Sequence, residues 1–338
     1  MLIPSQTCSD MADSLNVAAE ACRSGNIDSL QQILAHSPDI ITTRSTSGDT
    51  LLGLACRAAT GEIAIPPDPG TPEQHQAVDI ILQAGADPNA VDEDGWGPLH
   101  TAAMAGHADL ATRLLASGAT REGHLYSASG GSALALALFY AKTDMGEVLS
   151  PSVPDNLRHA AALGENLARF FERGQLTDQA IVGLDFYAPL VYFPKWQRRY
   201  SREEVLNEAL TWAARNGQIE SMQTLIDLGA DVNSNPYRGT PLLWAIYSAD
   251  NDAASWLLER GADPNLRHDF GGEGHGVNAT ALHLAAQFNS LDYIKLLLDR
   301  GADPTIVDAA HGGDAIGWAT FSGASEAAAL IKEFMGEH

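Results

Sequence analysis

Short alanine-rich segments alternate with short leucine-rich segments along most of the chain. Alanine pairs such as Ala102-Ala103 and Ala285-Ala286 mark the first kind, and leucine pairs such as Leu114-Leu115 mark the second. Small residues let neighbouring helices approach closely, while leucines fill the space between them. The pattern therefore predicts pairs of helices that pack pair against pair and share one continuous core.

Two short phrases mark the ends of the predicted helices. Thr-Pro-Leu or a close variant opens the alanine-rich segments, at residues 97–100, 240–243 and 280–283. Gly-Ala-Asp or a close variant follows the leucine-rich segments, at residues 85–89, 118–120, 229–233, 261–265 and 301–305. Threonine caps a helix and proline fits its first turn, whereas glycine ends a helix in the left-handed conformation. Successive phrases lie 33 residues apart between Gly85 and Gly118, which predicts a repeated helix pair.

Recurring in phase, the two phrases resemble the ankyrin repeat, a β-turn plus two helices in about 33 residues with a Thr-Pro-Leu-His signature. The resemblance covers nearly the whole chain. It implies an all-α ankyrin-repeat solenoid of about nine helix-turn-helix units with β-turn fingers, a bacterial-type array with an atypical central insertion. The small residues predicted between the two helices of each unit are Gly25, Ala59, Gly106, Ala141, Gly164, Gly217, Ala249, Asn289 and Gly323.

Departures from the repeat divide the chain. Residues 1–174 are predicted to hold five units, with a loop insertion at residues 61–75 that is rich in proline and aspartate. Phe170-Phe171 replaces the leucine pair of the fifth unit. Residues 175–201 form an aromatic and basic insertion, and residues 202–338 hold four units with lengthened, glycine-rich fingers. Because long connections in a compact array are usually functional or disordered, we expect function in the second half.

Histidines separate into two groups. His100 and His283 occupy the Thr-Pro-Leu-His position, so we expect them to make hydrogen bonds that stabilise the repeat. His268, His275 and His311 lie on adjacent fingers together with Asp269, where the repeat does not require them. An imidazole and a carboxylate brought together could perform acid/base or metal chemistry. The alternative is that these four are solvated loop residues, and no local catalytic signature accompanies them.

Aromatic residues concentrate in the second half of the chain, and six of the 23 lie between residues 186 and 200. Tyrosine and tryptophan bury a large area and keep a polar handle, which suits a recognition surface. For the tryptophans of the inner helices, packing between repeats is an equal alternative. The candidate ligand- or partner-binding residues are Tyr187, Tyr192, Trp196, Trp212, Tyr237, Arg238, Trp244, Tyr247, Phe288, Trp318 and Phe321.

The composition limits the classes of partner that we expect. The formal net charge of −23 argues against nucleic acid and anionic membranes, which both require surplus lysine and arginine. One basic cluster, Lys195, Arg198, Arg199 and Arg202, could hold an acidic group or pair with neighbouring acids. The three cysteines form no metal-binding pattern or disulfide framework, and no window has the length of a membrane span. We therefore expect a cytoplasmic monomer without a cofactor or a bound metal.

Two hypotheses about function follow. The first is a binding module that recognises a protein partner, of basic character, or a small molecule through its fingers and concave inner-helix face. The second is a small-molecule-binding protein or enzyme with an aromatic pocket between residues 175–201 and the last four repeats. In that case Asp269, His268, His275 and His311 are the candidate acid/base or metal-binding groups. The sequence leaves open whether any reaction is catalysed.

Overall fold

The computed structural model describes residues 6–60, 70–121, 131–150, 156–181, 201–236, 239–269 and 276–337, and only the backbone of residues 6–12, 269 and 337. These residues group into two compact units, one within residues 1–153 and one within residues 154–338. Each unit is built from helix pairs, as the alternating alanine-rich and leucine-rich segments predict. In the described parts of the chain, no helix has the length and apolar character needed to cross a membrane.

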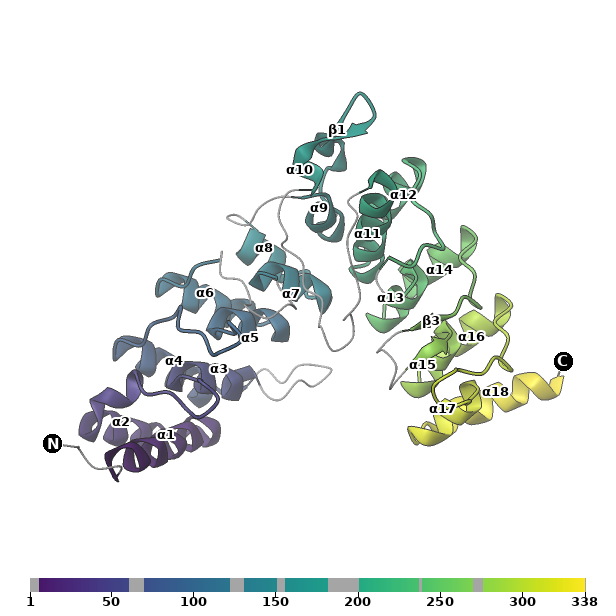
Figure 1. The fold of residues 1–338 in the computed structure, drawn as a ribbon. Coiled ribbons are helices and arrows are strands. Elements are labelled where there is room, and N and C mark those ends of the chain that lie inside the picture. Colours follow the sequence, from purple (N-terminus) through teal and green to yellow (C-terminus); the bar gives the residue numbers. More distant parts are fainter. Residues whose placement is uncertain are drawn as a thin grey trace. The chain divides into compact units, whose positions relative to one another are not determined.

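The first unit contains four helix pairs in its described residues. The first helices of the pairs lie side by side in one row and the second helices form another row (Figure 1). The elements are α1 (Gln6–Ser24), α2 (Ile27–His36), η1 (Pro38–Ile41), α3 (Leu51–Thr60), α4 (Pro72–Gln83), α5 (Pro98–Ala105), α6 (Ala108–Ala116), α7 (Ala133–Phe139) and α8 (Met145–Leu149).

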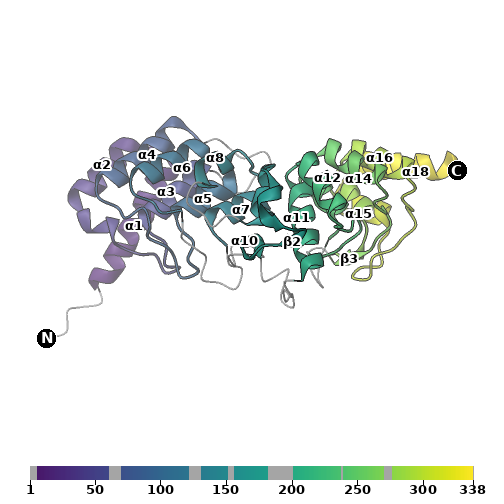
Figure 2. The same cartoon turned by 90° about the horizontal axis from the view of Figure 1, so that it is seen from above.

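The second unit repeats this plan and adds two short hairpins. Its two rows of helices separate clearly when viewed from above (Figure 2). The elements are α9 (Leu157–Leu163), η3 (Leu167–Phe170), β1 (Phe171–Glu172), β2 (Gln175–Leu176), α10 (Asp178–Ile181), α11 (Arg202–Arg215), α12 (Ile219–Asp227), α13 (Pro241–Tyr247), α14 (Asn251–Glu259), β3 (His268–Asp269), β4 (Val277–Ala279), α15 (Ala281–Gln287), α16 (Leu291–Asp299), α17 (Ala315–Phe321) and α18 (Ser325–Glu337).

The turn between the two helices of a pair requires a left-handed residue. Eight of the nine predicted turn residues have positive φ, from 54° at Ala141 and Asn289 to 76° at Gly106 and Gly323. The prediction for Ala59 is wrong, because Ala59 lies inside α3 and Gly70, with φ of 69°, has the left-handed conformation instead. Left-handed backbone costs an L-residue about 1 kcal/mol, so three turns without glycine carry some strain.

Asparagines connect successive fingers. The Asn233 side chain donates to the Gly261 carbonyl at 3.1 Å and accepts from the Asp263 N–H at 2.8 Å. Asn265 makes the same two bonds to Gly301 and Asp303, at 2.9 and 2.7 Å. In the first unit, Asn89 bridges to the next finger in the same way. We call this series the asparagine ladder, and it explains the last position of the Gly-Ala-Asp-x-Asn phrase.

Two expectations about irregular segments are corrected. Residues 72–75 belong to α4 rather than to a loop, because Thr71 and Gln74 form a capping box around Pro72. The second helix of the fifth unit is absent from the described residues, where η3 and the β1–β2 hairpin follow α9. Arg173 and Gly174, with φ of 52° and 78°, form the hairpin turn, since paired positive φ values suit two-residue loops. Phe170 is fully buried, whereas Phe171 begins β1.

The inter-helix turn gives a stability prediction. A Cβ atom at Gly217 would lie 2.1 Å from the Asp250 carboxylate, which caps α14 through the Ala253 N–H at 2.8 Å. Gly217→Ala should therefore lose both the conformational freedom and the cap, and cost about 2 kcal/mol of unfolding free energy. Gly323→Ala meets no atom within 4 Å and should cost only about 1 kcal/mol. Urea unfolding measures both, and equal losses would contradict the role of the Asp250 cap.

Candidate functional site

The inner helices of the second unit bury charged and aromatic side chains together. Every residue of α11 from Val205 to Arg215 is buried, so this helix has no solvent-facing side over that stretch. Within it, Glu208 pairs with Arg158 of α9 at 3.5 Å, and both side chains are at most 3% exposed. Ion pairs are costly to bury, and removing one partner leaves an uncompensated charge. No motif in the sequence marks this pair.

Arg215 lies at the end of α11 against two aromatic rings of the next inner helix. Its guanidinium carbon lies 4.3 Å from the Trp244 ring centroid and 4.7 Å from the Tyr247 ring centroid. The two rings meet edge to face at 5.7 Å, and Arg215 is only 3% exposed. A desolvated cation over aromatic faces contributes on the order of 2 kcal/mol. The side chain therefore fills the space between the inner helices α11 and α13.

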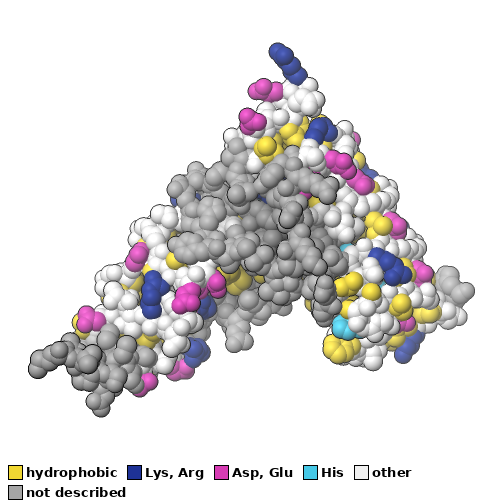
Figure 3. Space-filling model, viewed as in Figure 1, with side chains coloured by type: hydrophobic (Ala, Val, Ile, Leu, Met, Phe, Trp, Pro, Cys, Tyr) yellow, Lys and Arg dark blue, Asp and Glu magenta, His cyan; other side chains and the backbone are white. Residues whose placement is uncertain are grey.

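Aromatic residues farther along this row are exposed. Phe321 of α17 is 93% exposed and Phe288, which follows α15, is 53% exposed. Phe288 contacts the half-buried Tyr247 edge to face at 6.3 Å. By contrast, Trp212 and Trp244 are at most 2% exposed. These two tryptophans pack between repeats, which was the alternative to a role in binding. Hydrophobic side chains gather at this end of the second unit (Figure 3).

A cavity of about 320 Å³ opens beside Phe321. We call it the C-terminal cavity, and its lining residues are Gln287, His311, Gly313, Gly317, Trp318 and Phe321. Trp318, which is 8% exposed, is the most buried of its aromatic walls. The Gln287 Oε1 atom is buried and has no hydrogen-bond partner. An orphaned buried acceptor in a cavity wall is unusual and indicates where a donor would bind.

Asp308 holds the finger that carries His311 and fixes Trp318. Its Oδ2 atom accepts from the Trp318 indole N–H and the Gly313 N–H, both at 2.9 Å. Its Oδ1 atom accepts from the backbone N–H groups of Ala310 and His311, at 2.8 and 2.7 Å. Burial would raise the Asp308 pKa, but these hydrogen bonds outweigh it and lower the pKa below the usual 3.8. The carboxylate is a structural anchor for one cavity wall.

The structure describes three of the four catalytic candidates, which lie on two neighbouring fingers joined by the Ala309 N–H donating to the Val277 carbonyl at 2.7 Å. His268 is 4% exposed and sits in β3, where it pairs with Ala279, whereas His311 is exposed and lines the C-terminal cavity. The backbone of Asp269 pairs with Val277. His275 lies outside the described residues, as do the binding candidates Tyr187, Tyr192, Trp196, Tyr237 and Arg238. Among the residues that are described, no group of three or more acidic, histidine or cysteine side chains could hold a metal ion.

Histidines of the repeat signature have structural partners. The Gly97 N–H donates to the His100 ring at 3.2 Å, and the Thr280 N–H donates to the His283 ring at 3.1 Å. These are the repeat-stabilising hydrogen bonds predicted for both residues. Of the basic cluster, Arg202 donates to the Leu228 carbonyl at 2.9 Å and so stabilises the end of α12.

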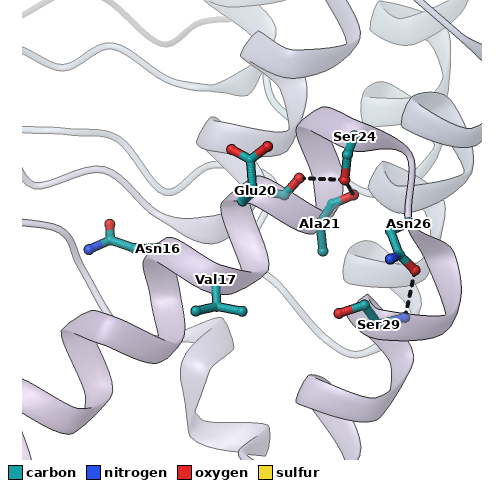
Figure 4. Close-up of a pocket in the computed structure, with 7 residues that line it drawn as sticks. All are labelled: Asn16, Val17, Glu20, Ala21, Ser24, Asn26 and Ser29. Carbon is teal, nitrogen blue, oxygen red and sulfur yellow. Dashed lines mark hydrogen bonds between the residues drawn. The ribbon is translucent and has the colours of Figure 1, made fainter.

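Other hollows are explained by local structure. Near the start of the first unit, α1 and α2 border a space of about 370 Å³ (Figure 4). Its Ser24 hydroxyl donates to the Glu20 carbonyl and its Asn26 side chain caps α2 at Ser29. A wider space of about 740 Å³ lies between the η3 segment and α12. Of these three spaces, the C-terminal cavity combines aromatic walls with an orphaned acceptor.

Comparison with protein families finds the repeats in three places. Models described as ankyrin repeats match residues 195–268 and residues 72–115, and a model of a single ankyrin repeat matches residues 278–309. The matched segments lie in both units and contain the phrases that carry the sequence resemblance, except the one at residues 118–120.

Curated relatives match over part of their length. Rabankyrin-5 of Homo sapiens is 26% identical over 246 residues, which cover 68% of this chain and 19% of that protein. The E3 ubiquitin-protein ligase KEG of Arabidopsis thaliana is 26% identical over 251 residues, covering 70% and 14%. Palmitoyltransferase Hip14 of Drosophila melanogaster is 37% identical over 98 residues, covering 29% and 14%. The chain thus spans less than a fifth of the length of these relatives.

Loss of the Asp308 charge should reduce stability in a pH-dependent way. Asp308→Asn leaves one acceptor for four donors and should cost about 2 kcal/mol at pH 7. Because the folded-state pKa is lowered, the stabilisation is present above the unfolded-state pKa and is lost as pH falls through the folded-state value. The difference between variant and wild type should therefore shrink below about pH 4 in urea unfolding. The exposed control Asp13→Asn should change the free energy of unfolding by less than about 0.5 kcal/mol. If the stability difference between Asp308→Asn and wild type did not depend on pH, the role given to the Asp308 carboxylate would be wrong.

Cys22 and Cys56 should be unreactive in the folded chain. Both are at most 1% exposed, and burial raises the pKa of each thiol to about 12. The thiolate is the reactive form, so neither should be alkylated by iodoacetamide at pH 8. Site-resolved mass spectrometry should find both labelled only after urea is added. Labelling of either residue under native conditions would show that the inner helices α1 and α3 open readily.

Proposed function

The chain is an ankyrin-repeat protein, and we propose that its second unit binds a protein partner through exposed aromatic residues. We use the term aromatic surface for Tyr247, Phe288, Phe321 and the C-terminal cavity. Ankyrin repeats are protein-interaction modules in general, and the proposal adds which part of this chain makes the contact. The observation that carries it is Phe321, whose side chain is 93% exposed next to a cavity.

Energetics favour these positions as contact residues. Burying a phenylalanine side chain contributes about 1.5–3 kcal/mol. Phe288 and Phe321 leave most of this free energy unused in the isolated chain, since they are 53% and 93% exposed. Interfaces depend on a few such anchors next to pockets rather than on contact area as a whole. Phe321 lines a cavity of about 320 Å³, and Phe288 follows Gln287 of its wall in the chain, which matches that arrangement.

The charge of the chain favours a basic partner. A net charge of −23 attracts positively charged proteins and raises their association rate, an effect that decreases with ionic strength. We propose that partner and chain meet in the cytoplasm as the sequence predicts. The ligase and transferase activities named for two relatives stay with those proteins, since this chain covers 14% of each.

A small-molecule site is the second candidate. The C-terminal cavity is large enough for a small ligand, and His311, one of the four predicted acid/base residues, lines it. No other titratable side chain lines it among the described residues, whereas acid/base catalysis normally pairs the histidine with a group that fixes its tautomer. A protein partner is therefore the better-supported proposal, with the cavity as one part of its contact.

Peptide selection tests the proposal without knowledge of the partner. Peptides from a random display library are selected on the full chain, and their dissociation constants are measured by fluorescence polarisation. We expect selected peptides to bind the double variant Phe288→Ser/Phe321→Ser at least about tenfold more weakly, the equivalent of roughly 1.4 kcal/mol.

The matched control is Val17→Ser, which removes an exposed apolar side chain, 56% exposed, from α1 in the first unit. It should leave the affinities unchanged. If the double variant binds the selected peptides as wild type does, the aromatic surface is not the contact site.

A further inference from the structure

Inner helices of the second unit share a register that can be counted back from each inter-helix turn residue. In α11, α13, α15 and α17, Arg215, Tyr247, Gln287 and Phe321 stand two positions before the turn. Five positions before the turn stand Trp212, Trp244, Leu284 and Trp318. Since neighbouring inner helices pack in the same way, residues at one register position have equivalent surroundings in each pair of helices.

The pair α11 and α13 shows a filled position. Arg215 stands two positions before the turn after α11. It lies against Trp244 and Tyr247, which stand five and two positions before the turn after α13. The guanidinium is desolvated and the side chain is 3% exposed. The chain thus contains an example of an arginine held by this arrangement of a tryptophan and a second aromatic ring.

The pair α15 and α17 shows the same position unfilled. Trp318 and Phe321 of α17 stand where Trp244 and Tyr247 stand two inner helices earlier, in α13, and Gln287 takes the place of Arg215. Glutamine is shorter than arginine, and the C-terminal cavity is lined by these three residues. The buried Gln287 Oε1 atom has no hydrogen-bond partner there. Phe321 is 93% exposed, as a ring without a group to cover it would be.

We propose that the C-terminal cavity is a binding slot for an arginine side chain of the protein partner, an inference that rests on the proposed function. A guanidinium stacks on aromatic faces and offers only donors, which matches two rings and an orphaned acceptor. Lysine fits less well, because its ammonium is compact and more strongly hydrated. The net charge of −23 further favours a cationic segment over a neutral one.

The intervening pair of helices agrees with this interpretation. Tyr247 occupies the register position between those of Arg215 and Gln287, and its ring packs against Phe288 at 6.3 Å. Between α13 and α15 this register position is therefore occupied by the Tyr247 ring of the chain itself. Among the inner helices α11, α13, α15 and α17, the cavity between α15 and α17 is the place where this register position is left open.

Titration with small probes tests the slot on the full chain. The probe is N-acetyl-L-arginine amide, and the readout is the indole N–H resonance of Trp318 in proton–nitrogen correlation spectra, identified by its absence in Trp318→Phe. We expect a saturable shift of this resonance and none for Trp244, whose position is filled by Arg215. The neutral isostere N-acetyl-L-citrulline amide should bind at least tenfold more weakly, and N-acetyl-L-lysine amide should lie between the two.

A variant that fills the slot from within provides the decisive comparison. Gln287→Arg should fold, because Arg215 occupies the equivalent position, and should weaken binding of the arginine probe at least tenfold. The control Gln32→Arg makes the same change of charge on the exposed face of α2 and should bind the probe as wild type does. Equal shifts with arginine and citrulline, or unchanged binding by folded Gln287→Arg, would overturn the slot.

The two proposals fail in different ways. If the probe does not bind but the selected peptides depend on Phe288 and Phe321, the slot is wrong and the aromatic surface stands. If the probe binds but the peptides ignore both phenylalanines, the partner docks elsewhere and the proposed function is wrong. The slot is also wrong if arginine in the selected peptides can be replaced by citrulline without loss of affinity.

Discussion

Each helix pair of this chain can bury its apolar faces only against the pairs next to it, and the remaining features follow from that constraint. Small residues at the inner helices, a left-handed turn within each pair and bridges between fingers all serve to bring neighbours close. The constraint also gives every inner-helix position a defined neighbour. The register of a side chain such as Arg215 therefore determines which residues it contacts. An unusual residue at one register position therefore changes the surface locally without changing the fold.

Sequence patterns predicted the parts of the fold that have local physical causes. Glycine after a leucine pair and threonine before proline act within one turn of helix, so helix pairs and most turn residues could be read directly. The fifth unit could not, because Phe170-Phe171 is equally apolar in a helix and in a hairpin. Thr71 and Gln74 likewise carried a capping signal that the proline-rich segment before them obscured.

Candidate site residues were predictable by type but not by exposure. Tyr247 and Phe321 hold the same register position and both looked like aromatic residues of a concave face, yet Tyr247 is half-buried and Phe321 is 93% exposed. The difference depends on the side chain of the preceding inner helix, which faces Tyr247 as Arg215 in one case and Phe321 as the shorter Gln287 in the other. The buried pair Arg158–Glu208 was missed for a similar reason, since charged residues in a helix normally indicate a solvent-facing side.

The asparagine ladder has a consequence for recognition at a distance. Because Asn233 and Asn265 tie each finger to the next through bonds of 2.7 to 3.1 Å, the rise from one repeat to the next is fixed by hydrogen bonds as well as by packing. Anchor points on successive repeats are then held at a constant interval. A segment that touches two of them gains effective concentration only if its own anchors have the matching separation. The array would then discriminate between partners by the length of partner chain that separates two contact residues. This selection does not depend on the chemistry of either contact.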